Sequence, residues 1–162
     1  MKFLFFVLFS LPVFSQSTCI HTPTQFSCVK YVKNYDGDTI TFSIPGVHDY
    51  FGKKAKVRLQ GVDAPEIKPK GQSSPCEKDW ARVARKFVET QLKGAKTIHI
   101  TKLNGRDKYG RILGQISYDG KDLKEALLKN YLAVPYEGKR KLIVNWCEMK
   151  MRLENKDEPK KL

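Results

Sequence analysis

Hydrophobic and polar positions alternate in short stretches of this chain and predict five strands. In the third stretch Ala55, Val57 and Leu59 alternate with charged side chains, which is the period-two pattern of a strand with one buried face. The first two stretches are rich in β-branched and aromatic residues, and Asp36-Gly37 between them is typical of a tight turn. The predicted strands are residues 28–35, 39–44, 54–59, 97–103 and 112–118.

Apolar residues at helical spacing predict one long helix after the third strand. Ser74 is its expected N-cap, with Pro75 in the first helical position and Glu77 completing a capping box. Gly94 is expected to end it. The apolar stripe that should face the core comprises Trp80, Val83, Ala84, Phe87 and Val88.

Two shorter helices are predicted over residues 121–129 and 139–153, each with one apolar face. The apolar face of the second includes Leu142 and Trp146. Residues 154–162 are rich in charge and are expected to be disordered.

The order of these elements predicts the fold class. Five short strands with a helix inserted after the third suit a small closed barrel of the OB type. We therefore expect an α+β protein that is mainly β, a five-stranded OB-fold barrel with three helices, built as one domain over residues 16–153.

Residues 1–15 have the features of a secretory signal peptide. Lys2 supplies the positive start, residues 3–9 form an unbroken apolar run, and Val13-Phe14-Ser15 is similar to a small-x-small cleavage site. The run is too short to span a membrane, which takes roughly 20 residues, and an N-terminal anchor is the alternative. We expect cleavage near Ser15 and a secreted or periplasmic monomer without stable membrane association.

The charge balance points to a polyanionic partner. Lys and Arg number 30 against 17 Asp and Glu, which gives a formal net charge of +13. Such a charge favours nucleic acid, anionic lipid or acidic polysaccharide, and the alternative is a soluble basic surface. The charge alone therefore limits the partner to these anionic classes and does not decide between them.

Four cysteines follow the signal segment and predict two disulfides, because an even number in an exported chain is typical of a disulfide framework. Three pairings can be drawn. We favour Cys19–Cys28, which are close in sequence, and Cys76–Cys147, which belong to two helices expected to pack on the barrel. Neither a Cys-x-x-Cys spacing nor a histidine cluster occurs in the sequence, so a zinc or histidine-metal site is not supported.

Two aspartates at the ends of predicted strands form a candidate metal site. Asp38 and Asp63 can converge there, and hard cations such as calcium take carboxylate and carbonyl oxygens together. With the backbone carbonyl of Ala64 they would form a calcium site that water and a substrate phosphate complete, while Asp36 would orient a bound water. The alternative is structural, since Asp-Gly is most often simply a turn.

One glutamate and two arginines complete a candidate catalytic set. Glu66, in a loop after Pro65, can take a proton from an attacking water. The guanidinium groups of Arg58 and Arg111 can bind non-bridging phosphate oxygens and stabilise the charge that grows in a five-coordinate transition state. An isolated glutamate is more often a solvated loop residue, and lone arginines are usually surface charges or ion-pair partners.

Three segments together resemble the staphylococcal nuclease (thermonuclease) family. They are Asp-Gly-Asp-Thr at 36–39, Arg-Leu-Gln-Gly-Val-Asp-Ala-Pro-Glu at 58–66 and Asp-Lys-Tyr-Gly-Arg at 107–111, in the order and spacing of that family. The resemblance implies an OB barrel with three helices. It also implies a secreted, calcium-dependent endonuclease that hydrolyses DNA and RNA with little sequence preference and leaves 3′-phosphate ends.

The resemblance also implies roles for individual residues. Ala64 departs from the family, which often has threonine there, and the loss of the hydroxyl can lower calcium affinity. No second tyrosine closely follows Tyr136, so base stacking can be weaker at that end. By resemblance the calcium ligands are Asp38, Asp63 and the Ala64 carbonyl, the catalytic residues are Glu66, Arg58 and Arg111, and the substrate-binding residues are Lys108, Tyr109 and Tyr136.

Two other function classes compete with a nuclease. The first is an inactive OB module that only binds nucleic acid, but descendants of that kind lose site residues, which this chain retains. The second is a cationic binder of anionic polysaccharide, which explains the charge and leaves the carboxylates unexplained.

Overall fold

The structure is a computed structural model that describes residues 19–69, 71, 73–139 and 141–157. The expected signal peptide at residues 1–15 lies outside the described residues. Within those described, no helix is both long and apolar enough to cross a membrane.

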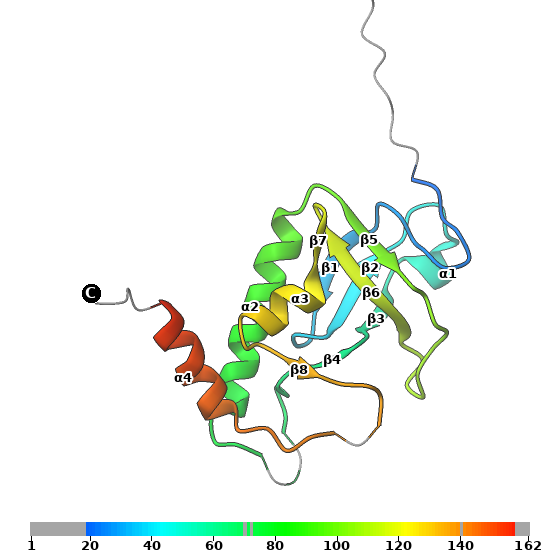
Figure 1. Ribbon diagram of the computed structural model, residues 1–162. Coiled ribbons are helices and arrows are strands. Elements are labelled where there is room, and N and C mark those ends of the chain that lie inside the picture. Colours follow the sequence, from blue (N-terminus) through cyan, green and yellow to red (C-terminus); the bar gives the residue numbers. More distant parts are fainter. Residues whose placement is uncertain (1–18, 70, 72, 140, 158–162) are drawn as a thin grey trace, which may run out of the picture.

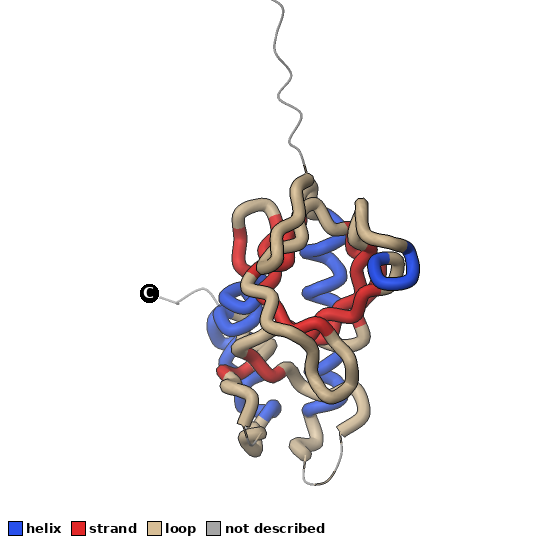
Figure 2. Tube along the Cα trace, turned by 90° about the vertical axis from the view of Figure 1, so that its right-hand side faces the viewer, coloured by secondary structure: helices blue, strands red, loops and turns tan. Residues whose placement is uncertain are grey.

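Five strands form a closed barrel, as predicted (Figure 1). The strands are hydrogen-bonded in the order β1-β2-β3-β6-β5, and β3 and β6 run parallel while the other neighbours are antiparallel. The chain just before β1 closes the ring onto β5, where Phe26 bridges to Ile100 and the Val29 N–H donates to Ile98 O at 3.0 Å. Figure 2 shows the strands encircling a common axis. The strands are β1 (Lys30–Asn34), β2 (Thr39–Ser43), β3 (Ala55–Leu59), β5 (Ile98–Thr101) and β6 (Ile112–Tyr118).

Three two-residue strands lie outside this barrel order and were not predicted. β7 (Lys121–Asp122) pairs with the end of β6. β4 (Val62–Asp63) pairs with β8 (Val134–Pro135), with Asp63 opposite Val134. The second pairing fixes Asp63 against a segment that follows it by about seventy positions in the sequence, so two distant parts of the chain meet at one end of the barrel.

The alternating pattern of the strands is confirmed by burial. Ile40 and Phe42 of β2 are fully buried, as is Val57 of β3, whereas Lys56 between core-facing neighbours is exposed. The core-facing residues of β2 and β3 therefore point into the barrel and the residues between them point away from it. Of these, Lys56 is exposed, whereas Thr41 and Arg58 are covered by other parts of the chain.

The described part of the chain has four helices around the barrel, one more than predicted: α1 (Asp49–Gly52), α2 (Glu77–Gly94), α3 (Leu123–Lys129) and α4 (Trp146–Asp157). α1 is a single turn capped by the His48 side chain, which accepts from the Tyr50 N–H, and so short an element has no periodic signal in the sequence. α2 packs on β1 and contacts α4, and both lie to one side of the barrel (Figure 1).

The predicted start of α2 is partly wrong. The helix begins at Glu77 with Cys76 at the N-cap position, and Ser74 Oγ accepts only a long 3.4 Å hydrogen bond from the Cys76 N–H. The Glu77 carboxylate does not complete a capping box, because its Oε1 accepts from the Glu66 N–H at 3.0 Å. Val83 was placed on the buried stripe but is 42% exposed, while the rest of the stripe is buried or half-buried.

The predicted bounds of the last helix are also wrong. α4 begins at Trp146, so the segment before it is a loop, and Leu142 is 68% exposed in that loop. The helix continues through Asp157, so residues 154–157 are helical where disorder was expected. The apolar spacing of Leu142 with Trp146 thus misplaced the helix start, because only Trp146 of the two is buried.

Both favoured disulfides are present, Cys19–Cys28 and Cys76–Cys147. The first closes a short loop before β1. The second joins the N-terminal ends of α2 and α4 across a sequence separation of 71 residues. Together with buried Trp146, it fixes the end of the 136–145 loop beside the barrel.

Candidate active site

The turn between β1 and β2 fixes the first acidic residues. Asp36 Oδ1 accepts from the backbone N–H groups of Asp38 (3.1 Å) and Thr39 (2.7 Å), which holds the turn closed. Gly37 lets the turn lie against Ala64, since a Cβ at position 37 would come within 2.8 Å of the Ala64 Cβ. The turn therefore presents Asp38 directly to the β4 region, as the sequence predicted for a convergent pair.

Asp38 and Asp63 lie on either side of one guanidinium group. Arg58 Nη1 is 2.9 Å from Asp38 Oδ2, and Arg58 Nη2 is 2.9 Å from Asp63 Oδ1. Asp38 Oδ2 also accepts from the Ala64 N–H at 2.7 Å, so Asp38, Asp63 and the Ala64 backbone meet at one point. The structure thus brings together the three residues that the sequence proposed as metal ligands.

Arg58 is a structural anchor as well as a member of the site. Its Nη1 donates to Leu59 O (3.0 Å) and Val62 O (2.9 Å) in addition to its ion pairs, and its side chain is only 11% exposed. Among the described residues, Nε–H and one N–H of Nη2 have no hydrogen-bond partner and remain for a ligand in the groove that Arg58 lines. The guanidinium therefore holds the two aspartates in place and can still bind a phosphate oxygen.

Glu66 lies at the opening of the site, and its side chain is 40% exposed. The Glu77 carboxylate fixes the Glu66 backbone by accepting from its N–H at 3.0 Å. The Glu66 Oε1 atom is 2.7 Å from Lys141 Nζ, and the same ammonium lies 2.9 Å from Asp63 Oδ1. The candidate general base is thus paired with a lysine in this structure.

Arg111 is positioned by the turn that contains it. Asp107 accepts from the Arg111 backbone N–H at 2.9 Å and from Nε at 2.7 Å. Arg111 Nη1 donates to Thr39 Oγ1 at 2.9 Å, which joins the β5–β6 turn to β2. The guanidinium also lies over the ring of Tyr109, 5.4 Å from its centre. Both arginines therefore have acidic partners and both reach the same groove.

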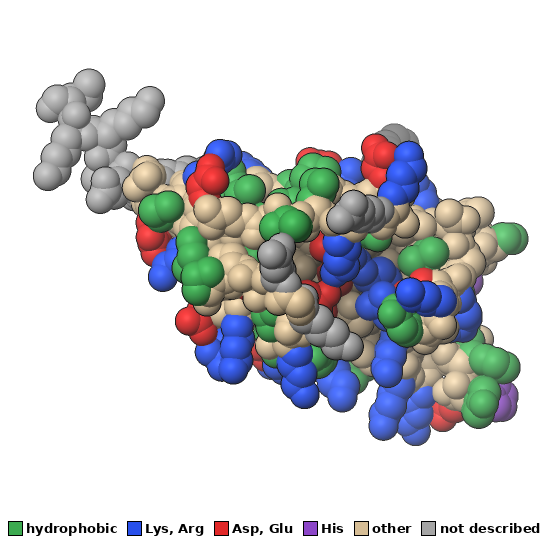
Figure 3. Space-filling view, turned by 90° about the horizontal axis from the view of Figure 1, so that it is seen from below, with side chains coloured by type: hydrophobic (Ala, Val, Ile, Leu, Met, Phe, Trp, Pro, Cys, Tyr) green, Lys and Arg blue, Asp and Glu red, His purple; other side chains and the backbone are tan. Residues whose placement is uncertain are grey.

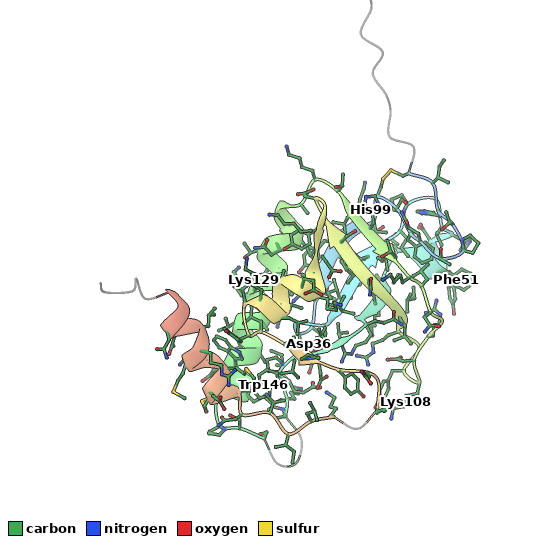
Figure 4. The ribbon with its side chains drawn as sticks, in the orientation of Figure 1. Asp36, Phe51, His99, Lys108, Lys129 and Trp146 are labelled. Carbon is green, nitrogen blue, oxygen red and sulfur yellow. A yellow bond between two sulfur atoms is a disulfide. The ribbon has the colours of Figure 1, made fainter. Side chains whose placement is uncertain are left out.

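A groove of about 760 Å³ joins most of these residues, while Asp63 lines a smaller neighbouring pocket together with Glu66 and Lys141. Seen from below in Figure 3, Lys and Arg side chains gather around a hollow in which acidic side chains are visible. In Figure 4, Asp36 lies between Trp146 of α4 and Lys108 of the β5–β6 turn. The groove is lined by the sequence-predicted residues Asp36, Asp38, Arg58, Glu66, Lys108, Tyr109, Arg111 and Tyr136, and by Lys141.

The three substrate-binding candidates all border this groove. Lys108 and Tyr109 are exposed on the β5–β6 turn, and the Lys108 ammonium lies 5.2 Å from the centre of the Tyr109 ring. Tyr136 also lines the groove, and its N–H donates to Gly61 O at 3.1 Å and its hydroxyl to Lys139 O at 2.7 Å. A strand lying in the groove would meet both cationic and aromatic groups.

Burial of the two acidic residues in the β1–β2 turn changes their ionisation. Burial raises the pKa of Asp38 to about 8, and the neighbouring Asp36 carboxylate adds to the rise, against the opposing effect of Arg58. Burial likewise raises the pKa of Asp36. Two adjacent carboxyl groups that resist ionisation are favourably placed for a divalent cation, because a bound cation stabilises their charged forms.

The donor set fits a hard cation. Among the described residues no three Asp, Glu, His or Cys side chains gather as a metal cluster. The candidate carboxylate ligands are Asp38 and Asp63, and the Ala64 group that contacts Asp38 here is its N–H rather than the expected carbonyl. Cationic side chains already lie between the acids, Arg58 between Asp38 and Asp63, and Lys141 between Asp63 and Glu66. An all-oxygen set that attracts two cationic groups suits calcium or magnesium better than zinc.

Four residues of this site were missed by the sequence interpretation. Lys141 was hidden inside a wrongly placed helix, and Glu77 was assigned to a capping box. Thr39 and Asp107 lie within the recognised motifs, where the four-residue spacing of Asp107 to Arg111 could have signalled an ion pair. These residues position the groups that the sequence did identify.

Comparison with known proteins places most residues of this site within a protein family. The family described as "Staphylococcal nuclease homologue" matches residues 56–158, a span that contains Arg58, Asp63, Glu66 and Arg111 and begins after Asp38.

Several relatives carry endonuclease names, among them two proteins of Bacillus subtilis and one of Escherichia coli. "Endonuclease YncB" of Bacillus subtilis (strain 168) is 38% identical over 99 residues, which is 60% of this chain and 43% of the relative. "SPbeta prophage-derived endonuclease YokF" of the same organism is 35% identical over 99 residues, 60% of this chain and 30% of the relative. An "Uncharacterized endonuclease" of Escherichia coli is 33% identical over 109 residues, 67% of this chain and 60% of the relative. The match thus spans less than half the length of either Bacillus subtilis protein.

Proposed function

Because this chain belongs to the family of staphylococcal nuclease homologues, we propose that it is an exported, calcium-dependent endonuclease that hydrolyses phosphodiester bonds of DNA and RNA with little sequence preference. One observation carries the proposal. A single groove is lined by Asp38, by the half-exposed Glu66 carboxylate and by Arg58 and Arg111, and Arg58 pairs with Asp63 just outside it. Together these are the groups that phosphodiester hydrolysis needs.

Arg58 and Arg111 bind the scissile phosphate in this proposal. They enter the groove from β3 and from the start of β6, so their guanidinium groups can approach two different non-bridging oxygens. Charge-assisted forks of this kind strengthen as negative charge grows on those oxygens. Their acidic partners hold both groups in place before substrate arrives, which lowers the ordering cost of binding.

Glu66 accepts the proton of the attacking water. For this it must leave Lys141, whose ammonium would otherwise keep the carboxylate from acting as a base. The water oxygen attacks phosphorus in line, and by family resemblance the 5′-oxygen leaves, so that the phosphate stays on the 3′ end. A phosphate bound by the two arginines would lie near Glu66, since all three line one groove.

Asp38, Asp63 and the Ala64 carbonyl would hold the calcium ion. When bound, the ion would neutralise charge on the phosphate and lower the pKa of a coordinated water. Asp36 keeps the turn closed and so keeps Asp38 aimed at this position. Because the Ala64 side chain offers no hydroxyl, water must supply the ligands that complete the coordination.

Export is supported by the cysteines. Both disulfides are of the kind that persists in oxidising compartments and is rare in the cytosol. Together with the predicted signal peptide, they favour a secreted or periplasmic enzyme. Its net charge of +13 suits polyanionic DNA and RNA as substrates for a monomer without stable membrane association.

One observation favours the alternative of an inactive nucleic-acid-binding module. Lys141 pairs with both Glu66 and Asp63, which would disable the base if the pairing persisted with substrate bound. Release of acid-soluble nucleotides from DNA and from RNA, with calcium and then with a calcium chelator, separates the two functions. The proposal expects cleavage that requires calcium, with 3′-phosphate ends, whereas binding without release of nucleotides would support the alternative.

A further inference from the structure

A second cationic site lies beside the catalytic groove, on the outer face of β1, β2 and β3. Ile40 and Phe42 of β2 are fully buried in the barrel, so Thr41 between them points away from the core, where it is 7% exposed. Lys56 of β3 lies next to fully buried Val57 and also faces outward, where it is exposed. The outer face therefore carries polar groups at this point.

The strand register places three of these outward residues in one row. Thr41 pairs with Lys33 of β1 on one side and with Lys56 of β3 on the other. The adjacent row contains Thr39 paired with Arg58, two residues along each strand. Two residues of a strand span about 6.6 Å, so the lysine row lies one side-chain step from the catalytic arginine.

This row opens into a concavity of about 390 Å³. Lys33, Lys56 and Arg85 line it together with Arg111, and no carboxylate contributes to its lining. Tyr35, which is 49% exposed, forms part of the wall. We call this concavity the Lys33–Lys56–Arg85 pocket.

The position of Arg85 is fixed by a buried side chain. Asn34, which is 4% exposed, donates through Nδ2 to Arg85 O at 3.0 Å and to Asp36 O at 2.8 Å. One amide thus joins α2, which carries Arg85, to the turn that carries Asp36. The pocket and the acidic site are held in a constant relation by this contact.

The three cations of the pocket lack acidic partners. In the part of the chain that the structure describes, no salt bridge involves Lys33, Lys56 or Arg85, whereas Lys93 pairs with Glu89 on the same helix as Arg85 at 2.5 Å. On a basic surface without a binding function, such cations would lie on a convex face and alternate with acidic side chains. Here they converge on a hollow, which favours an anionic ligand.

The pocket continues into the catalytic groove. Tyr35, Thr39, Tyr109 and Arg111 line both, and the hydrogen bond from Arg111 Nη1 to Thr39 Oγ1 lies at the boundary. A chain of phosphates that occupies one would therefore extend into the other. Tyr109, 72% exposed at this boundary, offers a ring face on which a base can stack.

We propose that the Lys33–Lys56–Arg85 pocket binds the phosphate and nucleotide of a single-stranded DNA or RNA segment adjoining the scissile phosphate, an inference that rests on the proposed function. Lys33, Lys56 and Arg85 contact the flanking phosphate, and Tyr35 stacks on its base. The pocket reads no base edge, which agrees with low sequence preference.

Oligonucleotide binding without metal tests the proposal. Fluorescence anisotropy with a fluorescein-labelled thymidine 12-mer, in a chelator that prevents cleavage, is measured from low to moderate salt. The double variant Lys33→Gln/Lys56→Gln should lose about tenfold in affinity at low salt. The slope of log affinity against log salt should fall by about 0.7 for each phosphate contact that is lost.

A matched variant separates contact from overall charge. Lys96→Gln/Lys121→Gln removes the same charge from exposed positions before β5 and on β7, and it should bind almost as the parent protein does. Lys33→Arg/Lys56→Arg keeps the charge and should retain both affinity and slope, which excludes misfolding as the cause of loss. Equal losses in the two Gln variants, or no loss in Lys33→Gln/Lys56→Gln, would overturn the proposal.

The same measurement distinguishes this proposal from the proposed function. If the parent protein binds the 12-mer through the pocket but releases no nucleotides with calcium, hydrolysis is wrong and the pocket assignment stands. If it cleaves DNA while the pocket variant binds like the matched variant, the nuclease stands and the pocket assignment fails. Absence of any oligonucleotide binding by the parent protein in chelator would overturn the pocket assignment, while hydrolysis is judged separately by nucleotide release with calcium.

Discussion

The ammonium group of Lys141 lies 2.7 Å from Glu66 Oε1, the carboxylate proposed to activate water, and 2.9 Å from Asp63 Oδ1, a proposed calcium ligand. One lysine thus pairs with two functional carboxylates at once. It comes from the loop before α4, whose end is fixed by the Cys76–Cys147 disulfide. In the proposed mechanism, calcium and substrate therefore displace this ammonium before the site acts.

Replacing Lys141 should strengthen calcium binding. In Lys141→Met the Asp63 and Glu66 carboxylates lose a competing cation, and a partly exposed ion pair of this kind contributes up to about 1 kcal/mol, or about fivefold in affinity. Isothermal titration of calcium into the substrate-free protein measures the change. Lys139→Met, which removes a cation from the same groove, is the control and should have a smaller effect. Unchanged or weaker calcium binding in Lys141→Met would show that Lys141 does not compete.

Calcium binding should release protons near neutral pH. Burial and the adjacent Asp36 raise the pKa of Asp38 to about 8, so below that pH the site without metal holds a proton that calcium must displace. Calcium affinity should therefore rise with pH between about 6 and 8, by up to about tenfold per pH unit for one released proton. Titrations in buffers of different ionisation enthalpy count the protons.

Asp36→Asn is the control for this linkage. Removing the neighbouring carboxylate should lower the pKa of Asp38, because a like charge no longer opposes its ionisation. The pH dependence of calcium affinity should then be flatter near neutral pH. A pH-independent affinity in the parent protein would mean that Asp38 is already ionised or is not a ligand.

The barrel could be predicted because its strands carry strong local patterns. In β3, for example, exposed Lys56 lies between buried Ala55 and Val57, as the sequence pattern predicted. The start of α4 could not be predicted in the same way, because Leu142 has helical spacing to Trp146 but lies exposed in a loop. Local spacing does not reveal which apolar residues the tertiary structure buries.

The candidate site likewise has residues that the sequence could predict and residues that it could not. The motif residues Asp38, Asp63 and Arg58 meet as the sequence proposed, because each motif has a defined place on the barrel. The partners Lys141 and Glu77 come from segments 75 and 11 residues away from Glu66, and no local pattern links them to it. Whether such residues meet depends on how the loops at this end of the barrel fold over one another, which local sequence does not reveal.

The Cys76–Cys147 disulfide should stabilise the fold more than Cys19–Cys28. It spans 71 residues against 9, and loop entropy gives about 4 kcal/mol for the longer loop and about 2.5 kcal/mol for the shorter one. Urea unfolding of Cys76→Ser/Cys147→Ser and of Cys19→Ser/Cys28→Ser compares the two. The expected order is a greater loss in the first variant. A greater loss of stability in the Cys19→Ser/Cys28→Ser variant would mean that α4 contributes little to the cooperative unfolding of the domain.

The two arginines should respond differently to replacement by lysine. Both Arg58→Lys and Arg111→Lys should lower kcat, because lysine keeps the charge but loses the planar fork. Arg58→Lys should also reduce the free energy of unfolding, by about 2 kcal/mol, since its buried guanidinium holds Asp38 and Asp63 together. Steady-state kinetics with urea unfolding of both variants checks this. Parent-like kcat in both would restrict the arginines to structural ion pairs.

The most direct test of the account is the kcat of Glu66→Gln at saturating DNA and calcium, because the variant keeps the shape of the side chain and removes its basicity. The account predicts a fall of about 100-fold or more in kcat, with oligonucleotide affinity in chelator unchanged. Glu137→Gln, an exposed acid in the neighbouring loop, is the matched control and should keep the parent kcat. A Glu66→Gln enzyme whose kcat stays within about twofold of the parent would contradict the central claim that Glu66 activates water in this groove.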